Sequence, residues 1–325
     1  MTSRLNVVVL NSYHVYGLFM TKLRITFLSI FFLSLSSVLF GQAVGDYRSN
    51  KNNFNWNDDS GWQRWNGTAW VTPTTAQGYP GKNAAGIAGT VTIQAGHTVS
   101  GNVDVTTNDL GRLIVAGTLN TTNNWDMDVT GNVEVTGTIN LNGDNSTLDI
   151  GGGLVVSGNG VFNAGKKNIY VTVANDYTMS NSATMNLSND EIYFTISGRL
   201  NMNDGTSINM SGNSADQKIT VNGDLIMAGT SQITGNNSRF IIDVKGNFEV
   251  PAGSTNARLG GVKFDVAGTT DISGTFTITS NTGDKRFNGA TKISGSWTST
   301  AVTSSDRVLF RSEVVTSGTF KPGCH

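Results

Sequence analysis

Along most of the chain, apolar and polar residues alternate in short runs that end at glycine or asparagine. Taking the glycine of the segment VTGNVEV as a reference, equivalent positions recur with separations of 20 to 25 residues: Gly111, Gly131, Gly152, Asn175, Gly198, Gly223, Gly246, Gly268 and Gly289. This regular spacing shows that one unit of about 22 residues is repeated about nine times, with small insertions.

The apolar residues keep the same place within each unit. Two positions before the reference they are Val129, Ile150, Val173, Ile196, Val221, Val244, Val266 and Phe287. From Met127 onward, the row four positions before the reference is also apolar, except at Lys285. Apolar residues again occupy most positions two and four places after it. A looser third row follows ten places after the reference: Leu141, Phe162, Met185, Ile208, Ile233 and Ile278.

A spacing of two predicts strands whose alternate side chains face one interior. Each unit therefore predicts two clear strands and a third, weaker one, with Gly or Asn at corners where a positive φ is needed. One unit cannot bury its apolar residues alone, but stacked units form continuous rows. The pattern predicts an all-β, right-handed parallel β-helix (β-solenoid) of about nine or more coils. An antiparallel sandwich or barrel also has many short strands, but it gives no reason for the same apolar positions in successive units.

The segment before the repeats differs from them and is rich in tryptophan. Residues 46–80 contain four of the six tryptophans of the chain: Trp56, Trp62, Trp65 and Trp70. Because the first coil of a solenoid needs its open edge covered, we expect a Trp-rich N-terminal cap over residues 42–85, followed by the solenoid over 86–325. The alternative is that these aromatic residues form a platform on which sugars stack. No clear cap precedes the final KPGCH, so we expect the C-terminus to be truncated.

The N-terminal region predicts a secretory signal peptide. Lys22 and Arg24 precede an apolar run over residues 25–40, and small Gly41 follows it. Met20 stands where such a peptide begins, so we assign 20–41 to the signal peptide and 1–19 to an upstream mis-start. The run is short and rich in serine for a membrane span, and we expect no membrane span in the mature chain. The predicted location is secreted, extracellular or on the cell surface.

Composition excludes several classes of function. Charged residues make up only 14% of the chain and the net charge is −1, so there is no basic surface for nucleic acid. The single cysteine, Cys324, supplies neither a disulfide framework nor a metal cluster. We expect no cofactor.

The opening GDYRS, the segment GWQRWNGTAWV, the strand VTIQAGHTV and repeats such as VTGNVEVTGTI resemble secreted β-helical surface or adhesin-like proteins of the Bacteroidota. Proteins of that kind are often exported by the type IX system and commonly end in a sorting domain, which is not seen here. The resemblance implies a surface-exposed solenoid, and it implies no catalytic residues in this sequence.

The most chemically suggestive pattern is a row of aspartates three positions before the reference. Asp128 and Asp149 occupy this place in successive coils, as do Asp243 and Asp265. Paired carboxylates could hold calcium or serve glycoside hydrolysis, but two side chains give calcium few ligands. We therefore favour a solvated strand face, on which water screens neighbouring charges. His97 has no Ser or Asp ordered around it in the sequence, so no triad is predicted.

We therefore expect a structural or adhesive β-solenoid module of a larger extracellular or cell-surface protein, with extracellular glycans or other surface proteins as partners. The alternative is a carbohydrate-active β-helix enzyme, a polysaccharide lyase or glycoside hydrolase. A third class is an ice-binding solenoid, suggested by the short threonine row of Thr172, Thr195 and Thr220.

Overall fold

A computed structural model describes residues 41–83, 89–189, 191–212, 216–280, 282–300 and 307–321. The chain divides into two units, Met1–Gln42 and Ala43–His325, and the second contains every strand described here. The predicted mis-start and nearly all of the predicted signal peptide lie outside the described residues. Within the described ranges, no helix is both long and apolar enough to cross a membrane.

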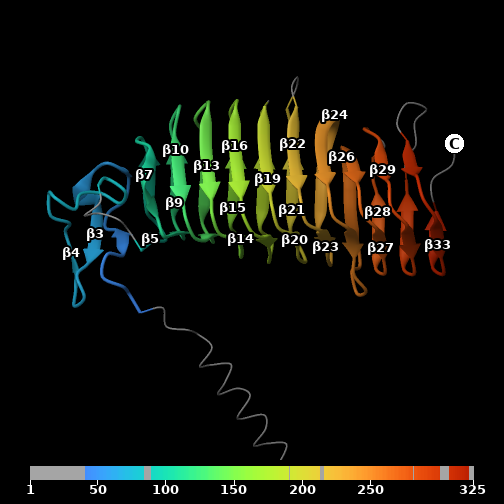
Figure 1. The fold of residues 1–325 in the computed structure, drawn as a ribbon, viewed down its shortest axis with the longest axis horizontal. Helices are drawn as coiled ribbons and strands as arrows, with labels where there is room; N and C mark the ends of the chain where they lie inside the picture. Colours follow the sequence, from blue (N-terminus) through green and yellow to red (C-terminus); the bar gives the residue numbers. More distant parts are fainter. Residues whose placement is uncertain are drawn as a thin grey trace, which may run out of the picture. The chain divides into compact units, whose positions relative to one another are not determined.

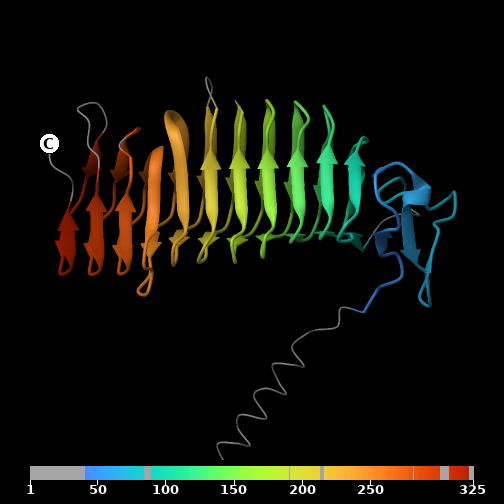
Figure 2. The same cartoon turned by 180° about the vertical axis from the view of Figure 1, so that it is seen from behind.

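The second unit is a parallel β-solenoid whose turns carry three strands each, stacked in register (Figures 1 and 2). Face 1 holds the strands that follow the reference glycine: β5 (Thr90–Ile93), β8 (Arg112–Val115), β11 (Val133–Val135), β14 (Leu154–Val156), β17 (Tyr177–Met179), β20 (Leu200–Met202), β23 (Leu225–Met227), β25 (Phe248–Val250), β27 (Thr270–Ile272), β30 (Thr291–Ile293) and β33 (Val314–Thr316).

Face 2 holds the strands that precede the reference: β7 (Val105–Leu110), β10 (Asp126–Val129), β13 (Ser146–Ile150), β16 (Ile169–Val173), β19 (Ile192–Ile196), β22 (Gln217–Val221), β29 (Lys285–Phe287) and β32 (Val308–Phe310). Face 3 holds the third strands: β6 (Thr98–Gly101), β9 (Thr118–Thr121), β12 (Thr138–Leu141), β15 (Val161–Ala164), β18 (Thr184–Leu187), β21 (Ser207–Met210), β28 (Thr275–Ile278), β31 (Ser296–Ser299) and β34 (Thr319–Lys321). Two long strands, β24 (Gln232–Val244) and β26 (Ala257–Val266), run along both faces and join them.

This arrangement confirms the parallel β-solenoid, at about ten turns in the described part of the chain. Its right-handedness stays a prediction. Along most strands buried and partly exposed residues alternate, so the apolar rows predicted from the sequence form one continuous core. Stacked turns thus bury together the apolar surface that a single turn would leave in water.

The first turn is covered by the tryptophan-rich segment. Strand β1 (Tyr47–Ser49) pairs in parallel with β5, and β2 (Phe54–Asn55) pairs in parallel with β6. A short 3-10 helix η1 (Asp59–Gly61) leads into β3 (Trp62–Trp65), which pairs antiparallel with β1 and with β4 (Trp70–Val71). Antiparallel β3 occupies the free edge of β1, so it prevents further parallel addition at that edge.

Lys285 breaks the apolar row four places before the reference, yet it faces the core. It lies in register between Phe264 and Val308 and is 1% exposed. Its Nζ donates to the carbonyl oxygens of Thr282 and Gly283, both at 2.7 Å. The buried amine is therefore satisfied by the backbone of the adjoining corner.

Glycine occupies the reference corners for a different reason from the one predicted. A positive φ is found at Gly158 (64°) and Gly229 (61°), but the reference glycines do not have one. A Cβ on Gly131 would instead lie 2.1 Å from the carbonyl oxygen of Gly111 in the turn below, and one on Gly289 would lie 2.3 Å from that of Gly268. The reference row is glycine-rich because corner backbones of successive turns approach one another too closely for a side chain.

The third strand also differs in detail from the prediction. Phe162 stacks on Ile139, and Leu141 stacks on Ala164, so the apolar row passes through Ile139 and not through Leu141. Leu259 belongs to the same row between Ile233 and Ile278, although it lies thirteen places after its reference. Variable loop lengths before this strand shift its register in the sequence.

Candidate functional site: the outward side of face 2

Face 2 presents two rows of outward side chains. The first row contains Asp126, Thr147, Tyr170, Tyr193, Lys218, Ile241 and Lys263. The second contains Asp128, Asp149, Thr172, Thr195, Thr220, Asp243, Asp265 and Arg286. The second row has the order expected from the sequence, which confirms that each pair of aspartates lies on adjacent turns.

The aspartate pair near the C-terminal end is neutralised by cations. Asp243 forms ion pairs at 2.8 Å with Lys218 and with Lys245. Burial alone would raise the pKa of Asp243, but hydrogen bonds and charge from the two lysines hold it below its usual value. Asp265 lies 3.9 Å from Arg286 and accepts a hydrogen bond from Asn288 at 2.7 Å.

The other aspartate pair has no such partner. In the described chain, no ion pair joins a lysine or arginine to Asp128 or Asp149. Partial burial, followed by the charges of Asp149, Asp109 and Asp126, raises the pKa of Asp128. Asp149 accepts a hydrogen bond from the Thr172 hydroxyl. This end of face 2 therefore keeps an uncompensated negative charge.

The metal interpretation gains no further ligand from the structure. Among the described residues, no three His, Cys, Asp or Glu side chains come together in a group that could hold a metal ion. Asp128 with Asp149, and Asp243 with Asp265, supply at most two carboxylates each, where calcium takes about six to eight oxygens. Calcium binding by these aspartates stays an untested alternative to a solvated strand face.

Two tyrosines lie beside the acidic end of face 2. The rings of Tyr170 and Tyr193 are nearly parallel, at 14°, with centroids 5.3 Å apart. Tyr170 is 47% exposed, which is unusual for a large side chain in this protein. Because Tyr193 lies on the C-terminal side of Tyr170, the opposite side of the Tyr170 ring faces the turns that carry Thr147 and Asp126.

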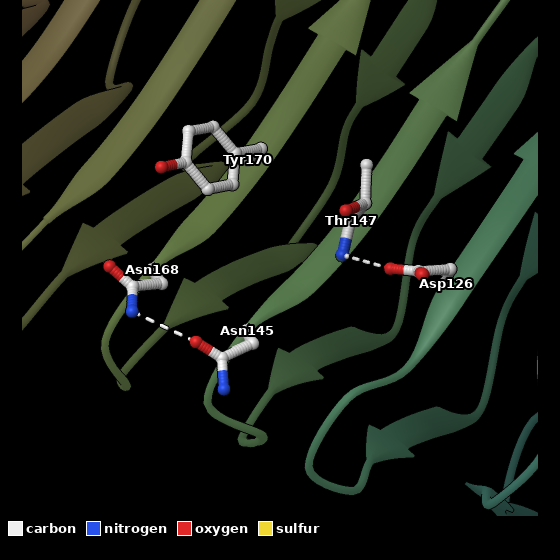
Figure 3. Close-up of a pocket in the computed structure, with 5 residues that line it drawn as sticks. All are labelled: Asp126, Asn145, Thr147, Asn168 and Tyr170. Carbon is white, nitrogen blue, oxygen red and sulfur yellow. Dashed lines mark hydrogen bonds between the residues drawn. The ribbon is translucent and has the colours of Figure 1, made fainter.

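A hollow of about 370 Å³ opens at that side, lined by Asp126, Asn145, Thr147, Asn168 and Tyr170 (Figure 3). Thr147 lies between Asp126 and Tyr170, and its small side chain leaves space where a larger residue would fill the first row. The Asp126 Oδ1 accepts from the Thr147 backbone nitrogen at 3.1 Å, which fixes the carboxylate over the next turn. The hollow thus combines a carboxylate, a hydroxyl, two amides and one aromatic ring.

The two amides of the hollow belong to a row of corner asparagines whose side chains are hydrogen-bonded from turn to turn, which the sequence analysis did not predict. We call such a row an asparagine ladder. Asn124, Asn145 and Asn168 occupy equivalent corners with φ of 53°, 56° and 54°. Asn168 Nδ2 donates to Asn145 Oδ1 at 2.8 Å, and Asn145 Nδ2 donates to Asn124 Oδ1 at 3.1 Å. Because every amide donates in the same direction, Asn168 Oδ1 is left at the end of the ladder as an acceptor without a partner among the described residues.

A second asparagine ladder runs along the outward side of face 3, and it too was missed. Its members are Asn120, Asn140, Asn163, Asn186 and Asn209. From Asn140 onward, each Nδ2 donates to the Oδ1 of the asparagine in the preceding turn at 2.6 to 2.9 Å. The sequence signal was a Thr/Val/Ser-apolar-Asn triplet repeated in the third strand, which the apolar pattern alone did not reveal.

The four tryptophans considered for sugar stacking lie in two environments. Trp56 and Trp62 are fully buried, and their indole nitrogens donate to the carbonyl oxygens of Pro80 and Trp56 at 3.0 and 2.8 Å. Trp65 and Trp70 are partly exposed, with ring centroids 5.5 Å apart. The Arg48 guanidinium lies 4.5 Å from the Trp70 ring centroid. Of these four, only Trp65 and Trp70 therefore offer surface to a ligand.

His97 has a serine partner that was not visible in the sequence. Ser49 Oγ and His97 Nδ1 are 2.8 Å apart, and Ser49 Oγ also accepts from the Gln94 backbone nitrogen at 2.9 Å. Ser49 is fully buried, so its hydroxyl is not presented to a substrate. The pair connects the cap to the first turn.

These features define a parallel β-solenoid with a tryptophan-rich first turn and patterned outward faces. Within that class, the chain belongs to the Discoidin-inducing complex B-subunit family, whose sequence model matches residues 81–315. No curated protein matches the chain, and no solved structure does. The resemblance to Bacteroidota surface proteins of the type IX secretion kind is therefore wrong. The short motifs behind it reflect the low complexity of a solenoid repeat, which unrelated families share.

Proposed function

We propose that this chain is a secreted, non-enzymatic β-solenoid subunit that presents its outward faces to partners within an extracellular assembly. The observation that carries the proposal is the unbroken register of outward rows across face 2. A stacked backbone holds side chains at a fixed spacing of about 4.8 Å, which suits repeated contacts with an extended surface.

Two further points support this proposal. The family description names a subunit of a discoidin-inducing complex, which agrees with a role in assembly. Two groups that a catalytic site could use are disfavoured: the serine of the Ser49–His97 contact is buried, and Asp243 is neutralised by its own lysines. Secretion rests on the basic residues and apolar run at the N-terminus.

The test is to express the tagged full chain in its native source, recover it from cells and medium separately, and measure its native mass. We expect the chain in the medium, without residues 1–41, in a species heavier than a single mature chain; the full 325-residue chain has a mass of 34.5 kDa. Recovery only inside the cells, or only as a free monomer, would contradict the proposal. Purified chain is also incubated with acidic and neutral polysaccharides, with and without calcium. Sustained cleavage would favour the enzymatic alternative.

A further inference from the structure

The hollow on face 2 has a volume within the range of small-ligand subsites. Its volume of about 370 Å³ lies at the lower end of the range for ligand pockets, which is about 300 to 1,000 Å³. The ring of Tyr170 forms one side, and Tyr193 supports that ring from behind by parallel stacking. A ring held in this way keeps its orientation without a bound ligand, so little side-chain freedom is lost on binding.

The lining chemistry fits a sugar ring. Apolar C–H groups of a pyranose can pack on the Tyr170 ring, while its hydroxyls need donors and acceptors at the edge. The Thr147 hydroxyl and the second oxygen of the Asp126 carboxylate supply them on one side of the hollow. The open Asn168 Oδ1, which points away from Asn145, adds an acceptor at the end of the hollow near Tyr170 (Figure 3). The floor is a strand backbone already paired on both sides, so these side chains are the groups left to bind a ligand.

The negative charge of the hollow limits the class of sugar that it can bind. Asp126 lines it without an ion pair to any described lysine or arginine, and Asp128 and Asp149 on the neighbouring row are equally unpaired. An acidic sugar would be repelled here. An ammonium group would meet a carboxylate and an aromatic ring, both of which attract it.

We propose that the hollow lined by Asp126, Thr147, Asn168 and Tyr170 is a saccharide subsite that selects a pyranose bearing a protonated amino group. The ring packs on Tyr170, and the ammonium group donates to the Asp126 carboxylate. This inference rests on the proposed role of face 2 as a binding surface, and it names the ligand class for one part of that face.

The experiment measures binding of three oligosaccharides to the purified full chain by calorimetric titration at pH 6. The probes are a glucosamine tetramer, the same tetramer fully N-acetylated, and a glucose tetramer. We expect the glucosamine tetramer to bind at least tenfold more tightly than the other two, and more weakly as salt is added, because the contact depends on charge.

Four variants locate the site. Tyr170→Ala and Asp126→Asn should each weaken glucosamine-tetramer binding by tenfold or more. Tyr170→Phe keeps the ring and should bind within about twofold of the natural chain. Thr220→Ala, on the outward side of the same face but outside the hollow, is the matched control and should bind unchanged. All of these positions face outward, and circular dichroism and the melting temperature check that each variant folds.

Several results would overturn the inference. They are absence of binding at millimolar glucosamine tetramer, equal binding of the acetylated or glucose tetramer, or binding that Tyr170→Ala and Asp126→Asn leave intact. Tetralysine is included as a peptide probe, and equally tight binding with the same dependence on the variants would assign the hollow to a basic peptide instead. The native mass of Tyr170→Ala distinguishes the proposed assembly role from the proposed sugar subsite. If Tyr170→Ala assembles normally but no longer binds the sugar, both proposals are supported. If the natural chain assembles normally but does not bind the sugar, only the subsite is refuted.

Discussion

Asp128 and Asp149 occupy the same outward position on adjacent turns, and no described lysine or arginine forms an ion pair with either of them. Five turns beyond Asp128 in the same row, Asp243 is paired with two lysines. The solenoid therefore places compensated and uncompensated carboxylates in one register. This contrast gives a direct electrostatic test of face 2.

Asp128→Asn should stabilise the protein at pH 7. Partial burial and the neighbouring aspartates raise the pKa of Asp128, so its ionised form costs folding free energy. Removing a like charge opposite another on neighbouring strands is worth about 0.2 to 1 kcal/mol. Because the folded-state pKa is raised, the cost is present above that pKa and disappears as the pH falls below the usual range for Asp. Thermal unfolding at pH 7 and pH 3 measures this difference.

Asp243→Asn is the matched comparison and should have the opposite effect. Its lysine partners lower the pKa of Asp243, so the carboxylate contributes stability at neutral pH that is lost as the pH falls through the lowered pKa. We expect a lower melting temperature for Asp243→Asn at pH 7 and little difference in acid. A stabilised Asp243→Asn, or a destabilised Asp128→Asn at pH 7, would show that these charges are screened or paired differently in solution.

The asparagine ladder of face 3 should make a measurable contribution to stability. Asn163 donates to Asn140 Oδ1 at 2.6 Å and accepts from Asn186 Nδ2 at 2.7 Å. Asn163→Ala removes both contacts and leaves partly buried amides without partners, at a cost of about 1 to 3 kcal/mol. At low pH the protonated carboxyl of Asn163→Asp can still donate to Asn140, so its loss should be smaller than that of the alanine variant. At neutral pH the ionised carboxylate cannot donate and places its charge against Asn140 Oδ1, so its loss should be larger.

The control for that prediction is Asn201→Ala on face 1, whose side chain makes a single hydrogen bond of 3.4 Å to Thr178. Its loss of unfolding free energy in denaturant titration should be well below that of Asn163→Ala. Equal losses for the two alanine variants would mean that the ladder adds nothing beyond what a partly buried asparagine outside it contributes.

Periodicity predicted much of the fold because the regular spacing of apolar residues determines which side chains form the core of a solenoid. The outward row from Asp128 to Arg286 was in the correct register for the same reason. The prediction of the third strand was less accurate, because a loop of variable length precedes this strand. Leu259 therefore lies outside the fixed spacing from the reference glycine by which the row was identified.

The candidate site was less predictable than the fold. The hollow depends on Thr147 being small next to Tyr170, a relationship between turns 23 residues apart that only the stacking reveals. The direction of the Asn145–Asn168 hydrogen bond, which leaves an open acceptor, likewise needs three-dimensional geometry. The pairing of Lys218 with Asp243 joins different outward rows on adjacent turns, so a search along one row did not find it.

Corner glycines should differ sharply in their tolerance of alanine. A Cβ on Gly137 would lie 2.0 Å from the carbonyl oxygen of Gly117 in the turn below, so Gly137→Ala must push two turns apart and should prevent folding or lower the melting temperature severely. Gly158 has a φ of 64° but open space around it, so Gly158→Ala should cost only the backbone strain of a left-handed alanine, about 1 to 2 kcal/mol. Soluble yield and melting temperature compare the two. Similar outcomes would contradict the idea that close backbone approach sets the glycine row.

The cap should depend on its buried tryptophans and not on its exposed pair. Trp62 is fully buried, and its ring packs edge to face on Trp56 and Phe54, with centroids 4.9 and 5.2 Å apart. Trp62→Ala should therefore cost about 3 to 5 kcal/mol and expose the first turn to water. Trp70→Ala removes a partly exposed ring and its contact with Arg48, which is worth about 0.5 to 1 kcal/mol. Hydrogen exchange of β1 and β5 distinguishes the two, because loss of the cap should raise exchange there first. Unchanged protection in Trp62→Ala would show that the first turn is stable without its tryptophan cover.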